Sequence, residues 1–549
     1  MKKAIKKVKF VVFSFAILAA LGFLNNNGII NLGFETNNVC AAAVLTSDDS
    51  KWKFSDDGII YTYLGSDSEI TIPSQLTSNN VTYNITTIPA TAFANKTSIT
   101  QINIGTNITI IEDAPFKNMT SLETVEVDPA NANYCDINGI LYNKAQTVLM
   151  RYPQMNSTQV FELPSTLLEF NTGALSYCNN VHTLIISSNF TGNINISNSE
   201  LYTSSFPNLT NIQVIQGNTE YSSEDGVLYN SNKTTLLWYP RKKSATDFTI
   251  PNSVTTLSSS SFYDIAYLQN INLTANITTI EPLCFKGCVL TSINNISTRA
   301  DYINWNSDIK SVFQKYLACF DGLPVVIALV NEEVQYAVDN YIEDNMTNYE
   351  KIKALYDYVA NKVSYDNDEV GAARNHCISS IFLNDMTVCE GYALGMTLLL
   401  DKIGIPNIPV SSDDHAWNIV QLNDIWLQID ITWDDGLSGT NYFLKTAYEY
   451  SQLTPVHSVY NSMKIAPFSY YSYAADRSMY VNNLPTCNAI IGDVYTDGVL
   501  DQNDLTTMTY EIRAYNMYSY YGYYNVMADL NRDGIIDTVD YNILDNLIN

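Results

Sequence analysis

The chain has 549 residues, of which 46% are hydrophobic and 15% charged, and this composition excludes a wholly disordered, collagen-like or disulfide-scaffold protein. The length predicts about three to five domains, because a single core rarely grows beyond ~300 residues. The formal net charge of −27 disfavours nucleic acids and anionic membranes as partners. Divalent cations or basic proteins suit such a chain better.

The N-terminal segment is typical of a secretory signal peptide. Five lysines precede or border an apolar run of 15 residues at Phe10–Leu24, which is short for a membrane span. Cleavage is expected after Ala41-Ala42-Ala43, so residues 1–43 are predicted to be removed. No later stretch is apolar for 18 residues. We therefore expect a secreted, extracellular chain without a membrane span.

Cysteines are sparse in the rest of the chain. Eight remain after residue 43, too few for a disulfide scaffold of this length. Cys284 and Cys288 are close enough in sequence to bridge, but two buried thiols are the simpler prediction. None of the four histidines stands at zinc spacing from a cysteine pair, so no zinc site is expected.

Residues 44–298 contain internal repeats. They are rich in Thr, Asn, Ser and Ile, and each unit has one short apolar strand and one aromatic anchor. Anchors recur 23 residues apart, as Phe93 and Phe116 and as Phe262 and Phe285. A single unit cannot form a core, but stacked units bury a continuous one, which predicts a solenoid.

Two short sequence motifs recur after 87 residues, which indicates duplication of a block of several repeats. Residues 139–143 return as residues 226–230, and Tyr152-Pro153 returns as Tyr239-Pro240. The stretch resembles the leucine-rich repeats of bacterial surface proteins. That resemblance implies a ligand-binding surface, whereas a plain β-solenoid spacer is the alternative.

The region from 335 to 475 opens with a helical pattern, in which Ile352, Leu355, Tyr356 and Val359 share one face. Further on, Thr387 and Glu390 form a capping-box pattern that predicts a helix starting at Thr387. Cys389 then falls in the first turn, where the positive end of the helix dipole favours a thiolate. The same helix is predicted to end at Gly404.

A nucleophilic thiolate needs a base and an orienting acceptor. His415 follows Cys389 by 26 residues in a strand-like run, and Asp430 lies in the next strand-like run. Adjacent strands are expected to bring Asp430 beside His415. Each residue alone is more often structural, but the three together predict a Cys–His–Asp triad. His376 is the weaker alternative base.

The strings VCEGYA, HAWNIV and DITWDD resemble the three signature blocks of the transglutaminase-like (papain-like cysteine enzyme) superfamily. The resemblance implies an α+β domain and carries the triad over onto Cys389, His415 and Asp430. It also implies acyl transfer through an acyl-enzyme. The Cys389 N–H is expected in the oxyanion hole with a second donor, for which Tyr365 and Asn384 are the candidates.

Two acidic loops of twelve residues lie 36 residues apart near the C-terminus, and a helix is predicted after each, at Leu505–Arg513 and Tyr541–Leu547. Each loop has glycine at position 6, where calcium loops turn sharply. The predicted calcium ligands are Asp493, Asp497, Asp501 and Asp504 in the first loop and Asp529, Asn531, Asp533, Asp537 and Asp540 in the second. Tyr495 replaces the usual ligand at position 3 of the first loop, so that site is expected to bind calcium more weakly.

This pair of loops resembles a type I dockerin, which implies a cohesin module of a scaffoldin as partner and a place in a cellulosome. The whole is predicted to be multidomain. Its order is a signal peptide (1–43), a leucine-rich-repeat β-solenoid (44–298), a connector (299–334), an α+β transglutaminase-like domain (335–475), a linker (476–489) and a small α-helical dockerin (490–549).

The predicted function is cysteine-dependent acyl transfer on peptide or amide bonds of a protein or peptide substrate, as a peptidase, amidase or transglutaminase-like enzyme. The alternative is an adhesive protein that binds through its repeats and has a vestigial transglutaminase-like domain. Retention of all three triad residues favours the enzyme.

Overall fold

The computed structural model describes residues 43–114, 116–192, 194, 205–412, 414–435, 441–453, 464–465, 484–494, 499–519 and 524–548. The predicted signal peptide lies outside them apart from Ala43, and so do Tyr495 and Asp497 of the first acidic loop. In this described part of the chain, no helix has both the length and the apolar character needed to span a bilayer.

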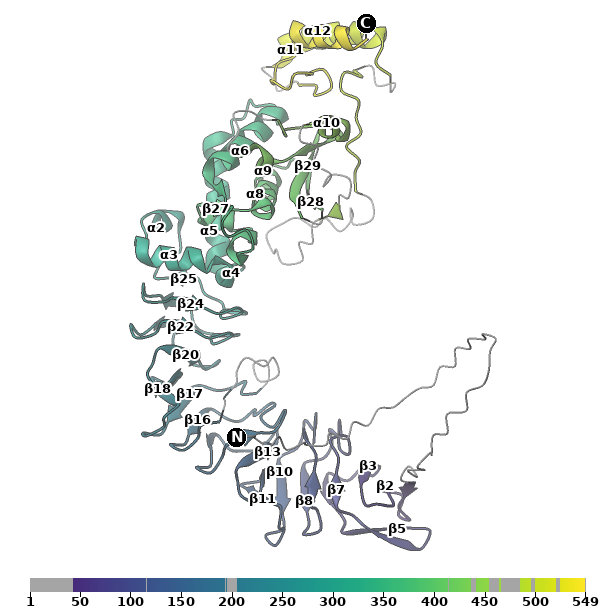
Figure 1. The fold of residues 1–549 in the computed structure, drawn as a ribbon, viewed down its shortest axis with the longest axis vertical. Helices are drawn as coiled ribbons and strands as arrows, with labels where there is room; N and C mark the ends of the chain where they lie inside the picture. Colours follow the sequence, from purple (N-terminus) through teal and green to yellow (C-terminus); the bar gives the residue numbers. More distant parts are fainter. Residues whose placement is uncertain are drawn as a thin grey trace, which may run out of the picture. The chain divides into compact units, whose positions relative to one another are not determined.

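Short β-strands build the region up to residue 293 (Figure 1). They are β1 (Val44–Thr46), β2 (Trp52–Ser55), β3 (Ile60–Tyr63), β4 (Glu69–Thr71), β5 (Gln75–Ser78), β6 (Val81–Asn84), β7 (Thr87–Ile88), β8 (Gln101–Ile104), β9 (Ile110–Ile111), β10 (Thr124–Val127), β11 (Tyr134–Ile137), β12 (Ile140–Asn143), β13 (Val148–Arg151), β14 (Val160–Glu162), β15 (Glu169–Phe170), β16 (Thr183–Ile186), β17 (Asn211–Val214), β18 (Tyr221–Glu224), β19 (Val227–Asn230), β20 (Thr235–Trp238), β21 (Asp247–Thr249), β22 (Thr256–Leu257), β23 (Asn270–Asn272), β24 (Thr279–Ile280) and β25 (Ser292–Ile293).

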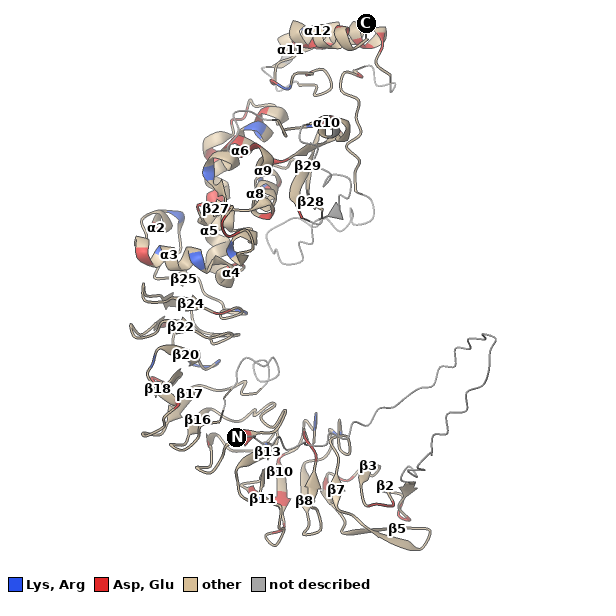
Figure 2. Ribbon diagram, viewed as in Figure 1, with Lys and Arg blue, Asp and Glu red and all other residues tan. Residues whose placement is uncertain are grey.

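Successive repeats align their strands in parallel ladders. The ladders β4–β8–β10, β14–β16–β17 and β21–β23–β25 each pair three strands in this way. In β8, Ile102 and Ile104 are buried while Gln101 and Asn103 are partly exposed. This alternation is the two-residue period of a strand with one face in the core. Figure 2 shows that the ribbon of this region carries few charged residues.

The predicted aromatic anchors are buried and touch one another. The ring centroids of Phe93 and Phe116 are 5.6 Å apart, and those of Phe262 and Phe285 are 5.2 Å apart. Phe285 also stacks on Phe320, at 4.9 Å, which belongs to the helices that follow. The 23-residue spacing therefore corresponds to one repeat, and the aromatic core continues beyond the last strand.

The predicted duplication of a block is visible as two matching three-stranded meanders, β11–β12–β13 and β18–β19–β20. Both turn between their first two strands through a residue pair with positive φ angles, Asn138-Gly139 and Asp225-Gly226, as two-residue hairpin turns require. Their register shifts at equivalent places, after Leu141 and after Leu228. Tyr152 and Tyr239, at the matching offset, are both fully buried.

The eight described cysteines are all free thiols. Cys284 and Cys288 are buried, as predicted. The Cys288 thiol donates to the carbonyl of Phe262 at 2.7 Å, and the Cys284 sulfur lies 3.3 Å from the Ser261 hydroxyl oxygen.

Helices occupy the predicted connector and continue past it. They are α2 (Arg299–Ile303), α3 (Ser307–Lys315), α4 (Leu317–Phe320) and α5 (Pro324–Tyr341). α2 is stabilised by a capping box in which the Thr298 hydroxyl and the Asp301 carboxylate each accept a backbone N–H.

The domain that follows packs helices on an antiparallel sheet of order β30–β29–β28–β31. Its elements are α6 (Asn348–Lys362), β26 (Ser364–Tyr365), the 3-10 helix η1 (Ala373–His376), α7 (Ser380–Leu383), β27 (Met386–Thr387), α8 (Cys389–Lys402), β28 (Asn407–Ser411), β29 (Ala416–Leu422), β30 (Ile425–Ile429), α9 (Ile431–Asp434), α10 (Ala447–Gln452) and β31 (Lys464–Ile465). Helix α8 contacts β28 and β29 on one side and α6 on another. The predicted apolar face of α6 is buried at all four positions.

The C-terminal residues form two helices, α11 (Gln502–Tyr518) and α12 (Thr538–Ile548), which pack against each other (Figure 1). Both predicted helices are confirmed, and both begin earlier and end later than expected. The Asp501 side chain caps α11 in a capping box with Asp504, so helix formation starts inside the acidic loop.

Candidate active site

Cys389 is the first residue of α8. The predicted capping box is wrong, because Val388 is the N-cap residue and no side chain caps the helix. Thr387 instead belongs to β27, where its hydroxyl donates to the carbonyl of Asn375 at 3.0 Å. The position of Cys389 in the first turn is nevertheless confirmed. Its thiol is half-buried at the helix end that favours a thiolate.

The start of α8 needs a residue without a side chain. A Cβ on Gly391 would lie 1.9 Å from Thr387 Oγ1 and 2.5 Å from Ser380 Oγ. The helix therefore approaches β27 and α7 as closely as it does because position 391 is glycine, and this close approach sets the location of the neighbouring thiol.

Gly391→Ala is therefore expected to lower the free energy of unfolding by about 1–3 kcal/mol through overpacking. Alanine in a helix interior is ordinarily favoured over glycine by about 1 kcal/mol, so packing reverses the usual sign. The urea midpoint of the intact protein measures the change. Gly371→Ala is the control, because no atom lies within 4 Å of its added Cβ. Equal effects of the two substitutions contradict the packing argument.

His415 lies between Cys389 and Asp430. Its Nε2 is 2.6 Å from Asp430 Oδ2. A carboxylate only accepts, so Nε2 carries the proton directed at Asp430. Nδ1 is the nitrogen left for the Cys389 side chain, which acts on the ring to raise its pKa. The structure thus brings the three predicted catalytic residues together.

Electrostatics favour the protonated form of this histidine. Burial acts to lower the pKa of His415, but the charge and hydrogen bond of Asp430, with a smaller contribution from Cys389, raise the pKa to about 10. A raised pKa keeps the imidazole protonated across the neutral range.

Asp430 is held at each of its polar groups. Its Oδ1 accepts the backbone N–H of Trp433, so it is the N-cap of α9. Its own N–H donates to the carbonyl of Tyr442 at 3.0 Å, and its carbonyl accepts the hydroxyl of Tyr356 at 3.0 Å. The side chain is only 1% exposed. An orienting acceptor with this many supports has little freedom to rotate away from His415.

Two tryptophans that the motif analysis did not single out cover the histidine. Trp417 stacks on the His415 ring at 5.7 Å, and Trp433 lies across it, with Nε1 2.6 Å from His415 Nε2. Both occur within the strings HAWNIV and DITWDD. Their aromatic identity next to His415 and Asp430 was the available signal, but only the packing shows that both rings lie against the His415 ring.

Both ring nitrogens of the alternative base, His376, face other hydrogen-bonding groups. Its Nδ1 is 2.9 Å from Glu390 Oε2, and its Nε2 is 2.8 Å from the carbonyl of Val370. The hydrogen bond to Glu390 raises the pKa of His376. With both nitrogens facing acceptors, this ring is poorly placed to take a proton from a thiol.

The structure separates the two candidates for the second oxyanion donor. β26 pairs with β27 so that Tyr365 lies opposite Thr387, two residues before Cys389. Burial, and after it the charge of Cys389, raise the pKa of Tyr365. Asn384 is the C-cap of α7, and its described hydrogen bond is from its backbone to Ser380. Proximity to Cys389 thus favours Tyr365.

The second acidic loop contains buried oxygen donors. Asp529 and Asp540 are fully buried, and burial raises the pKa of both carboxyl groups. Asp529 Oδ2 accepts from Tyr524 Oη and Gly534 N, whereas Asp540 accepts from loop backbone N–H groups. Carboxylate and amide oxygens are the donors that a hard cation prefers. Among the described residues, however, no three His, Cys, Asp or Glu side chains converge as a metal cluster.

Comparison with protein families assigns the two larger parts of the chain. Residues 86–233 and 239–311 match the family described as BspA type leucine rich repeat region, in six copies. Residues 336–431 match the transglutaminase-like superfamily. The chain combines a BspA-type repeat region with a transglutaminase-like domain. Cys389, His415 and Asp430 all lie inside the second match.

Several solved structures are similar to part of this chain. A leucine rich cell surface protein from Faecalibacterium prausnitzii A2-165 is 20% identical, with a TM-score of 0.32, over 48% of this chain and 80% of that one. The pneumococcal vaccine antigen PcpA is 20% identical over 47% and 72%, with a TM-score of 0.30. A structure described as a TGase is 17% identical over 28% and 40%, with a TM-score of 0.18. No curated protein matches the chain significantly.

Proposed function

We propose that the protein is a secreted cysteine-dependent acyl-transfer enzyme that acts on peptide or amide bonds. One observation carries the proposal. A cysteine at the first position of a helix interacts with His415, whose Nε2 lies 2.6 Å from a buried carboxylate, Asp430. This arrangement provides nucleophile, base and orienting group in the order that thiol catalysis requires.

In the proposed reaction, the Cys389 thiolate attacks the carbonyl carbon of the amide, and the thiol proton resides on His415. Charge develops on the carbonyl oxygen, where the backbone N–H of Cys389 is one donor and Tyr365 is the candidate for the second. His415 gives its proton to the departing amine, which leaves a thioester on Cys389. Water or a primary amine then attacks the thioester, returns a proton through His415 and releases the acid or the new amide.

Incubation with a protein mixture, with and without a labelled primary amine, tests this function. Shorter products in the absence of amine indicate a peptidase, and label incorporated into protein indicates a transferase. Absence of both, under conditions in which the protein is folded, contradicts the enzymatic proposal.

The second candidate function is adhesion through the repeats. The observation that favours it is the extent of the BspA-type region, whose matched residues outnumber those of the transglutaminase-like match. A thiol-directed alkylating reagent separates the two. An enzyme reacts at Cys389 far faster than at the other thiols, whereas a vestigial site reacts no faster than they do.

We also propose that residues 490–549 form a calcium-binding dockerin that recruits a cohesin module and so attaches the protein to a cellulosome. Described carboxylates of both loops are buried, at Asp493, Asp504, Asp529 and Asp540. The helices expose large apolar side chains suited to a protein partner, at Tyr510, Met517, Val539 and Leu547. Binding of a cohesin by residues 490–549 in calcium, and its loss in chelator, is the test.

Within this proposal the two calcium sites are unequal. Tyr495 carries a phenol on a rigid ring, which is too long to coordinate from position 3, whereas the second loop has Asn531 there. Calcium affinity follows the number and charge of its oxygen ligands. The second loop is expected to fill first, and Tyr495→Asn is expected to tighten the first site and raise the thermal midpoint in limiting calcium. Two equal sites by titration calorimetry, or no change on substitution, contradict this prediction.

A further inference from the structure

Asp435, the residue directly after α9, connects two elements of the candidate active site. Its Oδ2 accepts the backbone N–H of Tyr365 at 2.8 Å and the hydroxyl of Tyr392 at 2.9 Å. Tyr365 belongs to β26, and Tyr392 lies in the first turn of α8, three residues after Cys389. One carboxylate oxygen therefore joins the candidate oxyanion donor to the helix that begins with the nucleophile.

The N–H of Tyr365 is not used in the pairing of β26 with β27. The N–H groups of the residues on either side, Ser364 and Asp366, donate to backbone carbonyls in and next to β27. Successive N–H groups of a strand point to opposite edges, so the Tyr365 N–H faces away from β27. Asp435 is the acceptor that this backbone donor needs, and the bond fixes the outer edge of β26.

Tyr392 is the buried partner of Asp435, with a side chain that is only 1% exposed. Burial, and after it the charge of Asp435, raise the pKa of the phenol, so the hydroxyl keeps its proton and donates to the carboxylate. The carbonyl of Val363 is the more distant acceptor, at 3.4 Å. Because residues three apart share a helix face, fixing the Tyr392 hydroxyl also fixes the orientation of the turn that carries Cys389.

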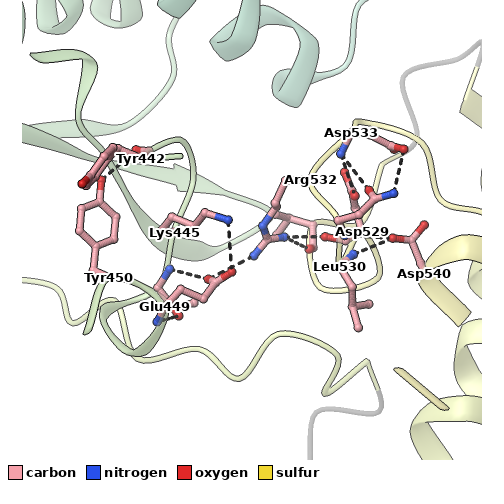
Figure 3. Close-up of polar contacts among 12 residues, drawn as sticks. Tyr442, Lys445, Glu449, Tyr450, Asp529, Leu530, Arg532, Asp533 and Asp540 are labelled. Atoms are coloured by element: carbon pink, nitrogen blue, oxygen red, sulfur yellow. Dashed lines mark hydrogen bonds and ion pairs between the residues drawn. The ribbon is translucent and has the colours of Figure 1, made fainter. Parts of the chain in front are cut away.

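Asp435 is held in place because α9 is fixed at both ends. At its start, the Asp430 N–H donates to the carbonyl of Tyr442, which also accepts the Tyr450 hydroxyl at 2.8 Å (Figure 3). At its end, the Asp434 carboxylate accepts the N–H of Tyr442 at 3.1 Å. The segment that begins with the proposed orienting carboxylate thus ends next to Asp435.

We propose that Asp435 is a positioning residue for acyl transfer, which sets the distance between the Cys389 thiol and the candidate oxyanion donor Tyr365. It acts through Tyr365 and Tyr392 and not on the reacting atoms. This role rests on the proposed acyl-transfer function. A displacement of about 1 Å in such a site costs on the order of 10²-fold in rate, whereas the reactivity of the thiol itself depends on His415.

Two reagents that react with the same thiol separate these effects in the full chain. With p-nitrophenyl acetate, the Cys389 sulfur bonds to the acetyl carbon through a tetrahedral oxyanion, and p-nitrophenolate leaves. Iodoacetamide alkylates the thiolate by direct displacement of iodide, without an oxyanion. Asp435→Ala is expected to slow acetylation of Cys389 about 10–100-fold and to change its alkylation by less than about twofold. Peptide mass analysis assigns both reactions to Cys389.

Two conservative variants test whether the hydrogen bonds carry the effect. Asp435→Asn keeps an acceptor oxygen and is expected to restore most of the acetylation rate. Tyr392→Phe deletes one of the two bonds to Asp435 and is expected to slow acetylation, again without slowing alkylation. The control is Asp344→Ala, on an exposed residue between α5 and α6, which is expected to change neither rate.

Acetylation that is unchanged in Asp435→Ala and in Tyr392→Phe overturns the positioning role. A parallel fall of acetylation and alkylation overturns it too, because it shows that Asp435 merely supports the thiol. Should Asp435→Ala fail to fold, Tyr392→Phe decides by the same two rates. A wild-type Cys389 that reacts with neither reagent faster than the other thiols contradicts the acyl-transfer function itself, and the positioning role with it.

Discussion

Replacing Cys389 with alanine is expected to abolish acyl transfer, with a fall in kcat on the order of 10⁴-fold or more, while folding and calcium binding are retained. The reason is that the substitution removes only the sulfur, at a half-buried position where a smaller side chain leaves the surrounding contacts in place. Release of products from the protein mixture measures the loss, and the circular dichroism spectrum checks the fold.

The matched control is Cys135→Ala, which removes a partly exposed thiol from β11 in the repeats and is expected to leave the rate unchanged. His415→Ala is expected to cost about as much as Cys389→Ala, and the double variant little more than either one, because residues that act as a unit lose activity non-additively. Turnover that survives in Cys389→Ala would falsify the assignment of the nucleophile.

Asp430→Asn is expected to reduce kcat by roughly 10³–10⁴-fold, the size of effect seen when an orienting carboxylate is lost from a triad. Asparagine retains the size of the side chain and an N-cap oxygen, so the loss is mainly of charge. The pH dependence of kcat tests whether the lost charge acts through the protonation of His415. In the wild type the alkaline limb of kcat is expected near pH 10, where His415 gives up its proton, and in Asp430→Asn this limb is expected to move to lower pH.

The pH dependence of stability is expected to reflect the same titration of His415. The pKa of His415 is about 10 in the folded protein and 6.5 for the ordinary side chain, so the folded state binds more protons between these values. The stabilisation from the His415–Asp430 pair is therefore fully present below about pH 6.5 and is lost as the pH rises through about 10. In Asp430→Asn this decline in the thermal midpoint is expected to be smaller.

Asp424→Asn is the control for both measurements, because Asp424 is exposed in the turn between β29 and β30. An alkaline limb at the same pH in the wild type and in Asp430→Asn would show that Asp430 does not set the protonation of His415. Retained rate in Asp430→Asn would remove it from the catalytic residues.

Regular spacing of residues in the sequence explains why much of the fold could be predicted. Phe93 and Phe116, like the motifs that recur after 87 residues, repeat at fixed intervals because the aromatic residue of each repeat packs against that of the next. The buried face of α6 follows from helical spacing. The end of α8 at Lys402 follows from Gly404, two residues further on, whose positive φ glycine adopts easily. The two C-terminal helices likewise follow from their acidic caps and apolar patterns.

The start of α8 could not be predicted correctly from the same kind of signal. Thr387 and Glu390 have the spacing of a capping box, but Thr387 pairs in β27 with β26 and its hydroxyl is used by Asn375 and Ser380. Residues 7 and 12 positions earlier in the chain thus compete for the hydroxyl that the local sequence assigned to the cap. The helix begins at Cys389 instead, where the first backbone N–H groups have no intrahelical partner.

The sequence by itself determined the repeat period, the helical and strand segments, and the identities of Cys389, His415 and Asp430, because these depend on spacing and side-chain chemistry. Only the tertiary structure decided which His415 nitrogen faces Asp430, that Trp417 and Trp433 cover the pair, and that Tyr442 and Tyr356 hold the Asp430 backbone. The contact of Arg532 with Glu449 joins residues 83 positions apart in the chain. Such contacts depend on how separately folded elements pack, and no local periodicity encodes them.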